Sequence, residues 1–145
     1  MHFVDAKSIL SAKNGMNIYR GCTHGCIYCD SRSDCYNMRH NFEDIEVKRN
    51  APELLEKALA SKRRLCMIGT GAMSDPYMHC EEKLRLTRQC LEVIDRHGFG
   101  VTVLTKSDMI LRDADLLCSI NSKAKAVVQM TLTTYDENLC RILEP

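Results

Sequence analysis

Three cysteines stand close together near the start of the chain, in the spacing C-x3-C-x2-C. They are Cys22, Cys26 and Cys29, and they fall within the segment 20–29. Thiolates supplied at close spacing from one loop are typical ligands of a four-iron cluster. Because three ligands serve four irons, one iron is left without a protein ligand. By analogy with open catalytic metal sites, this position is predicted to bind and activate a small molecule.

Two other interpretations of the triplet stay open. The spacing i, i+4, i+7 would also place three thiols on one face of a helix, as buried core residues. Gly21 and Gly25 oppose a helix, since each costs about 1 kcal/mol relative to alanine. The other interpretation is a zinc site, with a fourth ligand from Cys35, His24 or His40. Structural zinc sites usually use two separated ligand pairs, so the tight triplet favours the cluster.

Length and composition restrict the class of protein. A chain of 145 residues can bury one core and forms one domain at most. Its hydrophobic fraction of 45% opposes disorder, its charged fraction of 27% opposes membrane spanning, and no apolar run is long enough to span a membrane. Nine cysteines, an odd number, with no signal-like segment at the start, indicate a reducing compartment, so we expect a cytoplasmic protein. The net charge of +1 gives no field that would attract a polyanion.

Short apolar runs alternate with amphipathic segments along the chain. Strands are predicted at 16–19, 65–68, 100–105 and 126–132, and helices beginning near 52, 81, 107 and 136. Segment 35–50 is predicted to be a loop with a short strand. This alternation is typical of parallel βα units with right-handed crossovers. We expect residues 1–14 to be an N-terminal extension and residues 15–145 to form about four such units.

Several motifs occur in a fixed order over nearly the whole chain. They are the cysteine triplet with Tyr28 before its third cysteine, and the segments 17–22, 69–77, 104–107, 112–117, 131–134 and 143–145. Together they closely resemble the radical S-adenosylmethionine (radical SAM) superfamily. Within it, the resemblance is to the spore photoproduct lyase-like branch, also called DNA repair photolyase-like.

The resemblance implies an α/β fold, the N-terminal part of a partial (β/α)6 TIM-like barrel. Four βα units fall short of six, so we expect the chain to be truncated, and to pair with the remaining C-terminal half of the barrel or to self-associate. The resemblance also implies an enzyme that binds a [4Fe-4S] cluster and reductively cleaves S-adenosylmethionine to a 5′-deoxyadenosyl radical. By the same analogy, the electron donor is a flavodoxin or ferredoxin, and a nucleic acid is a candidate substrate of a lyase-like reaction.

Individual roles follow from the matched motifs. Cys22, Cys26 and Cys29 match the cluster ligands, and Tyr28 matches the aromatic residue beside the adenine, although core packing would also explain it. Further cofactor contacts are expected at Gly69, Gly71, Ser74, Asp75, Lys106, Ser107 and Thr131. Ser74 and Asp75 offer acceptors for the amino group, and Lys106 suits the carboxylate or the ribose. Each of these residues would also fit a cap or an ordinary loop.

One position departs from the lyase pattern. Ala72 stands where spore photoproduct lyase has the cysteine that returns a hydrogen atom to the product radical, with Cys80 nearby in the sequence. This departure opposes cleavage of a thymine photodimer. Two alternatives from other classes are a zinc or iron–sulfur module in which the metal only stabilises the fold, and a metal-free interaction domain.

Overall fold

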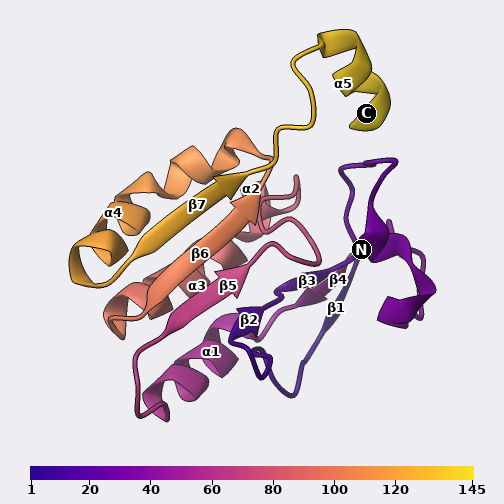
Figure 1. Ribbon diagram of the computed structural model, residues 1–145. Helices are drawn as coiled ribbons and strands as arrows, with labels where there is room; N and C mark the ends of the chain where they lie inside the picture. Colours follow the sequence, from indigo (N-terminus) through magenta and orange to yellow (C-terminus); the bar gives the residue numbers. More distant parts are fainter.

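The computed structural model describes residues 1–145 and contains two β-sheets (Figure 1). The larger sheet has four parallel strands in the order β2 (Gly15–Met16), β5 (Met67–Thr70), β6 (Gly100–Thr105) and β7 (Ala126–Met130). In the smaller sheet, β4 (Glu46–Lys48) lies between β1 (His2–Val4), which is parallel to it, and β3 (Tyr19–Arg20), which is antiparallel. The predicted α/β class with a parallel sheet is confirmed.

Four α-helices lie between strands along the chain, and a fifth follows the last strand. They are α1 (Ala51–Ala60), α2 (Glu81–Leu84), α3 (Leu86–Arg96), α4 (Ala114–Lys123) and α5 (Glu137–Leu143). Helix α3 packs between α1 and α4, and α4 contacts β6 and β7, so these three helices form one layer (Figure 1). Val101 and Val103 of β6 are fully buried in the apolar core, together with Leu55 of α1 and Leu91 of α3. Burial of such side chains stabilises the layered arrangement by roughly 1.5–3 kcal/mol each. No helix is long and apolar enough to cross a membrane.

The predicted first strand, 16–19, is divided between the two sheets. Met16 pairs with Thr70 of β5, whereas Tyr19 pairs with Val47 of β4. The chain therefore changes sheets just before the cysteine segment. Residues 1–14, expected to be an extension, contribute β1 and the buried Ile9 to the same packed unit.

Two further boundaries differ from the sequence prediction. The strand expected at 65–68 begins at Met67 and continues to Thr70, because Gly69 pairs with Thr102 of β6. The helix expected to begin near 81 is interrupted at Arg85, whose φ of 53° places it in the left-handed region. The short strand inside segment 35–50, the strand at 100–105 and the capped helical segment after Ser107 are confirmed.

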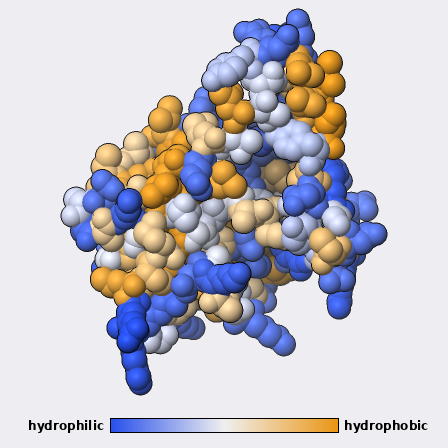
Figure 2. Space-filling view, viewed as in Figure 1, coloured by the Kyte–Doolittle hydropathy of each residue, from blue (hydrophilic) through white to orange (hydrophobic).

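The larger sheet is open, because β7 has a neighbouring strand on one side only. Barrel closure is not observed. Apolar side chains at this end of the molecule are exposed: Val128, Met130, Leu132, Leu139 and Ile142. Figure 2 shows such apolar surface over α5, at the upper right of the view. An unpaired parallel edge with exposed apolar side chains is a surface that another strand could extend.

A buried charge network joins the helical layer to the segment after β6. The carboxylates of Glu81 and Asp113 have no solvent exposure. Arg112 lies between them, with nitrogen–oxygen distances of 3.1 Å to Glu81 and 2.7 Å to Asp113. Arg88 lies 3.0 Å from Asp113 on its other side. Glu81 also accepts a hydrogen bond from the Tyr19 hydroxyl, so the network reaches the strand that leads into the cysteine segment.

Removal of Arg112 should therefore destabilise the fold strongly. The substitution Arg112→Met keeps an unbranched apolar stem but leaves Glu81 without its cation, and a broken buried pair costs about 3–5 kcal/mol. We expect this loss in the free energy of unfolding, measured by urea denaturation. The matched control, Arg141→Met on the exposed face of α5, should change it by less than about 0.5 kcal/mol. Equal effects of the two substitutions would contradict a stabilising role for the network.

Candidate active site

The cysteine segment is a loop that leaves the end of β3. Gly21 has a φ of +89°, and a Cβ at this position would lie 2.2 Å from the carbonyl oxygen of Phe42. The next residue, Cys22, donates its backbone N–H to that same oxygen at 3.2 Å. Residues 21–29 form no helix, so the interpretation of three core thiols on one helical face is wrong. The loop conformation instead directs the cysteines toward a pocket.

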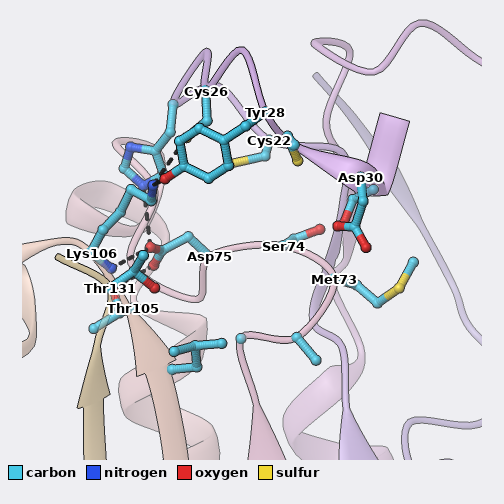
Figure 3. Close-up of a pocket in the computed structure, with 16 residues that line it drawn as sticks. Cys22, Cys26, Tyr28, Asp30, Met73, Ser74, Asp75, Thr105, Lys106 and Thr131 are labelled. Carbon is cyan, nitrogen blue, oxygen red and sulfur yellow. Dashed lines mark hydrogen bonds and ion pairs between the residues drawn. The ribbon is translucent and has the colours of Figure 1, made fainter. Parts of the chain in front are cut away.

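The pocket lies between this loop and the carboxyl ends of β5, β6 and β7. In Figure 3, Cys22, Cys26 and Tyr28 lie on one side, with Ser74, Asp75 and Thr105 facing them from the strand ends. The residues that line it are Cys22, His24, Cys26, Tyr28, Cys29, Asp30, Ser31, Gly71, Ala72, Met73, Ser74, Asp75, Leu104, Thr105, Lys106 and Thr131. All three cysteines of the triplet thus contribute to one cavity at the edge of the sheet where parallel α/β folds place ligands.

The three thiols are free and are spaced too widely for one metal ion. They do not form a group whose ligand atoms all lie within 4.8 Å of one another. A tetrahedral zinc ion with Zn–S bonds of about 2.3 Å would need sulfurs roughly 3.8 Å apart. In a four-iron cluster each thiolate binds a different iron, which allows a wider spacing. Burial raises the pKa of the Cys22 thiol, while backbone hydrogen bonds from His24 and Asp75 oppose this effect.

Asp75 holds the strand-end loops together. Its Oδ1 accepts hydrogen bonds from the backbone N–H of Tyr77 at 2.8 Å and from the Thr105 hydroxyl at 2.6 Å. Its Oδ2 accepts the backbone N–H of Lys106 at 2.9 Å and lies 3.5 Å from Nε2 of His24. Burial opposes ionisation, but these donors outweigh it, so the pKa of Asp75 is held below its usual value. Both oxygens already have protein partners, so the carboxylate primarily positions other residues.

Ser74 is the residue on this loop with unused hydrogen-bonding capacity. Its Oγ atom is buried and has no hydrogen-bond partner. Buried polar atoms without a partner are uncommon, and such an atom in a pocket wall suits a bound ligand. Gly71 has a φ of +99°, and a Cβ there would lie 1.8 Å from the carbonyl oxygen of Leu104. The glycine therefore lets the loop pass close over β6 before it reaches Ser74.

Lys106 extends from the end of β6 to the cysteine loop. Its Nζ lies 3.1 Å from Sγ of Cys26 and 2.7 Å from both the Tyr28 hydroxyl and Oε1 of Glu144. Burial alone would lower the pKa of Lys106, but the hydrogen bonds with Glu144, Tyr28 and Cys26 raise it above its usual value. A permanently charged ammonium group is thus placed beside Cys26, as the dashed lines in Figure 3 indicate.

The chain end packs against the cysteine loop. Ile27 donates its N–H to the carbonyl oxygen of Leu143 at 3.0 Å, and the position of Gly25 faces the ring of Pro145. Glu144 accepts hydrogen bonds from Lys106, from Tyr28 and, at 2.6 Å, from Thr133. Although burial opposes ionisation, these donors lower the pKa of Glu144 to about 2. Two segments that are 116 residues apart therefore meet at this carboxylate.

The structure brings most of the predicted site residues together. Nine of them line the pocket: Cys22, Cys26, Cys29, Tyr28, Gly71, Ser74, Asp75, Lys106 and Thr131. Gly69 lies inside β5, and the Ser107 hydroxyl accepts a hydrogen bond from the N–H of Met109 as a helix cap, so neither lines the cavity. Ala72 lies in the wall, whereas Cys80 does not, and burial raises the pKa of Cys80 to about 11.

Sequence reasoning missed several residues at the site, among them Thr105, Asp30 and Glu144. Thr105 ends the predicted strand and carried a usable signal, since it stands at the carboxyl end of the strand directly before Lys106. Asp30 follows the cysteine triplet directly and had no distinguishing pattern. Glu144 belongs to the segment 143–145 that carried part of the resemblance, but only the fold places it against Lys106.

Comparison with known proteins identifies this arrangement. Residues 16–145 match the model of the radical SAM superfamily. An uncharacterized protein of Methanocaldococcus jannaschii is 33% identical over 144 residues, covering 98% of this chain and 52% of the relative. An uncharacterized protein of Mycobacterium tuberculosis is 28% identical, covering 89% and 40%, and one of the Acidianus two-tailed virus is 24% identical, covering 90% and 45%. No solved structure matches.

The chain belongs to the radical SAM superfamily. Membership implies a [4Fe-4S] cluster and S-adenosylmethionine as cofactors. The residues present fit both groups, because three thiols, an unpartnered hydroxyl at Ser74 and the ammonium of Lys106 face one cavity. The chain spans about half the length of the curated relatives it matches, or somewhat less.

The ion pair between Glu144 and Lys106 is expected to stabilise the docking of the chain end on the loop that carries the cysteines. In the protein before reconstitution, Glu144→Gln removes a charge-assisted hydrogen bond, which contributes about 1.5 kcal/mol or more. The N–H of Ile27 should then exchange with deuterium on the order of tenfold faster, because its acceptor is on the same segment as Glu144. Exchange is measured by NMR.

The matched control is Glu137→Gln, at the first residue of α5, the helix that precedes Glu144. Glu137 is 87% exposed and lies 3.7 Å from Arg141 only, so its removal should leave the Ile27 exchange rate unchanged. If Glu144→Gln also left this rate unchanged, the docking of the chain end would not depend on the Glu144 carboxylate.

Proposed function

We propose that this chain is the cofactor-binding part of a radical SAM enzyme that reductively cleaves S-adenosylmethionine to begin a radical reaction on a separate substrate. The observation that carries this proposal is the convergence of Cys22, Cys26 and Cys29 with Ser74 and Lys106 on one pocket. Bound there, the reduced cluster supplies the electron and S-adenosylmethionine supplies the 5′-deoxyadenosyl radical. The protein residues bind, orient and shield these groups.

Specific roles follow from the partners of each residue. The free hydroxyl of Ser74 is the acceptor that suits the amino group of the cofactor. Lys106 suits its carboxylate, with its charge already ensured by its surroundings. Tyr28 lies next to Lys106, with the ammonium 5.0 Å from the ring centroid, and offers an exposed face for the adenine. Asp75 acts as a positioning residue for the loop that carries Ser74.

The finer features suggested by the resemblance stay predictions. A nucleic-acid substrate and a lyase reaction rest on the resemblance alone, and Ala72 in the pocket wall opposes the hydrogen-return step of spore photoproduct lyase. A flavodoxin or ferredoxin as electron donor likewise stays a prediction. We also propose that further strands extend the sheet at β7, either from the remaining half of a barrel or from a second copy, supported by its unpaired edge.

The proposed cleavage is tested with the protein reconstituted with iron and sulfide without oxygen and reduced with dithionite. Incubation with S-adenosylmethionine should yield 5′-deoxyadenosine and methionine in equal amounts, measured by mass spectrometry. Cys26→Ala should abolish the products, since it removes a cluster ligand. Cys118→Ala, at an exposed cysteine of α4, should leave them unchanged.

Ser74→Ala should weaken cofactor binding about tenfold, through the loss of one hydrogen bond to a charged group.

Two results would contradict the proposal. The first is a reduced protein with a complete four-iron cluster that forms no 5′-deoxyadenosine. The second is product formation that is equal in Cys26→Ala and in the wild-type chain.

A further inference from the structure

A second group of metal-ligand side chains lies away from the cysteine pocket, on the three-stranded sheet. His2 of β1 and Glu46 of β4 are partners in the parallel register of these strands, so their side chains lie side by side. His40 approaches them from the preceding loop. One ligand atom from each of His2, His40 and Glu46 lies within 4.8 Å of the others. His40 is therefore placed with these residues and not with the cysteines, as the zinc alternative for the triplet had allowed.

The hydrogen bonds of His40 define which of its nitrogens is free. Nδ1 lies 3.0 Å from the carbonyl oxygen of Asn41, which can only accept, so Nδ1 carries the hydrogen. Nε2 of the neutral ring then has a lone pair. This Nε2 is buried without a hydrogen-bond partner and lies 3.8 Å from Oε2 of Glu46. Two electron-rich atoms that face each other at this distance repel unless a cation lies between them.

His2 is also held through Nδ1, although its side chain is 40% exposed. Its Nδ1 lies 3.0 Å from Oδ2 of Asp44, which orients the ring and leaves Nε2 with the lone pair. A histidine held through one nitrogen by a carboxylate or carbonyl, with the other nitrogen free, is the usual arrangement of a metal-binding histidine. The rings of His2 and His40 lie edge to face, with centroids 5.0 Å apart and an interplanar angle of 86°.

We propose that His2, His40 and Glu46 bind a divalent transition-metal ion, for which Zn²⁺ is the probe. Two imidazole nitrogens and one carboxylate oxygen are a common three-ligand set for zinc and leave a fourth position open to water or a ligand. The ion would join β1 and β4 to the loop that precedes β4 and contains His40. The same loop contains Phe42, whose carbonyl oxygen accepts the N–H of Cys22. A metal at this site therefore steadies the segment against which the cysteine loop rests.

The proposal is tested with the reconstituted protein, dialysed against a range of free Zn²⁺ concentrations and analysed for zinc by mass spectrometry. The wild-type chain should bind one zinc ion that His40→Gln and Glu46→Gln bind at least about tenfold more weakly. The matched control is His97→Gln. His97 pairs with Glu56 at 2.5 Å outside this group, so its substitution should not change zinc binding.

A second measurement keeps the test valid if a variant fails to fold. In protein with ¹⁵N-labelled histidine, zinc should shift the Nε2 resonances of His2 and His40 and leave those of His97 unchanged. Unchanged His2 and His40 resonances would overturn the proposal and assign a proton, in place of a metal ion, to the space between His40 and Glu46. Zinc binding by His40→Gln and Glu46→Gln that equals that of His97→Gln would overturn it as well.

Discussion

The carboxylate of Asp75 connects the parts of the site that come from distant segments of the chain. One buried side chain accepts N–H groups from its own loop and from Lys106, together with the hydroxyl of Thr105, and it lies next to His24 of the cysteine loop. These contacts fix the end of β5 relative to the end of β6. The orientation of Ser74 and the starting point of the Lys106 side chain both depend on this geometry. Hydrogen bonds from these donors favour the anion over the acid and so lower the pKa of Asp75 despite its burial.

Two other carboxylates, Glu81 in the core and Glu144 near the chain end, also hold segments around the site. Glu81 lies below the site in the core and connects Tyr19, at the start of the cysteine segment, to Arg112. Glu144 lies above the site and connects the chain end to Lys106 and Tyr28. The cysteine loop has no regular secondary structure of its own between Gly21 and Cys29. Its position is therefore determined by hydrogen bonds to neighbouring segments, and both carboxylates act on residues that flank or contact it.

Sequence patterns predicted the parts of this molecule that depend on local chemistry. The cysteine spacing, the strand at 100–105 and the cap at Ser107 are local features, and each is present. The division of strand 16–19 between two sheets could not be predicted, because it depends on β4 and β5, which are distant in sequence. The same limit applies to the meeting of Glu144 with Lys106 and to the pairing of His2 with Glu46. Asp75 was placed in the correct pocket, but its acceptors proved to be occupied by protein donors.

The proposed function requires that Cys22, Cys26 and Cys29 hold a four-iron cluster and leave one iron for S-adenosylmethionine. The most direct measurement is the electron paramagnetic resonance spectrum of the reduced, reconstituted protein, recorded with and without the cofactor. We expect the signal of a reduced four-iron cluster whose g values change when S-adenosylmethionine is added, and the loss of this signal in Cys29→Ala. A colourless protein that holds stoichiometric zinc at the triplet, or a cluster signal that does not respond to the cofactor, would contradict the claim.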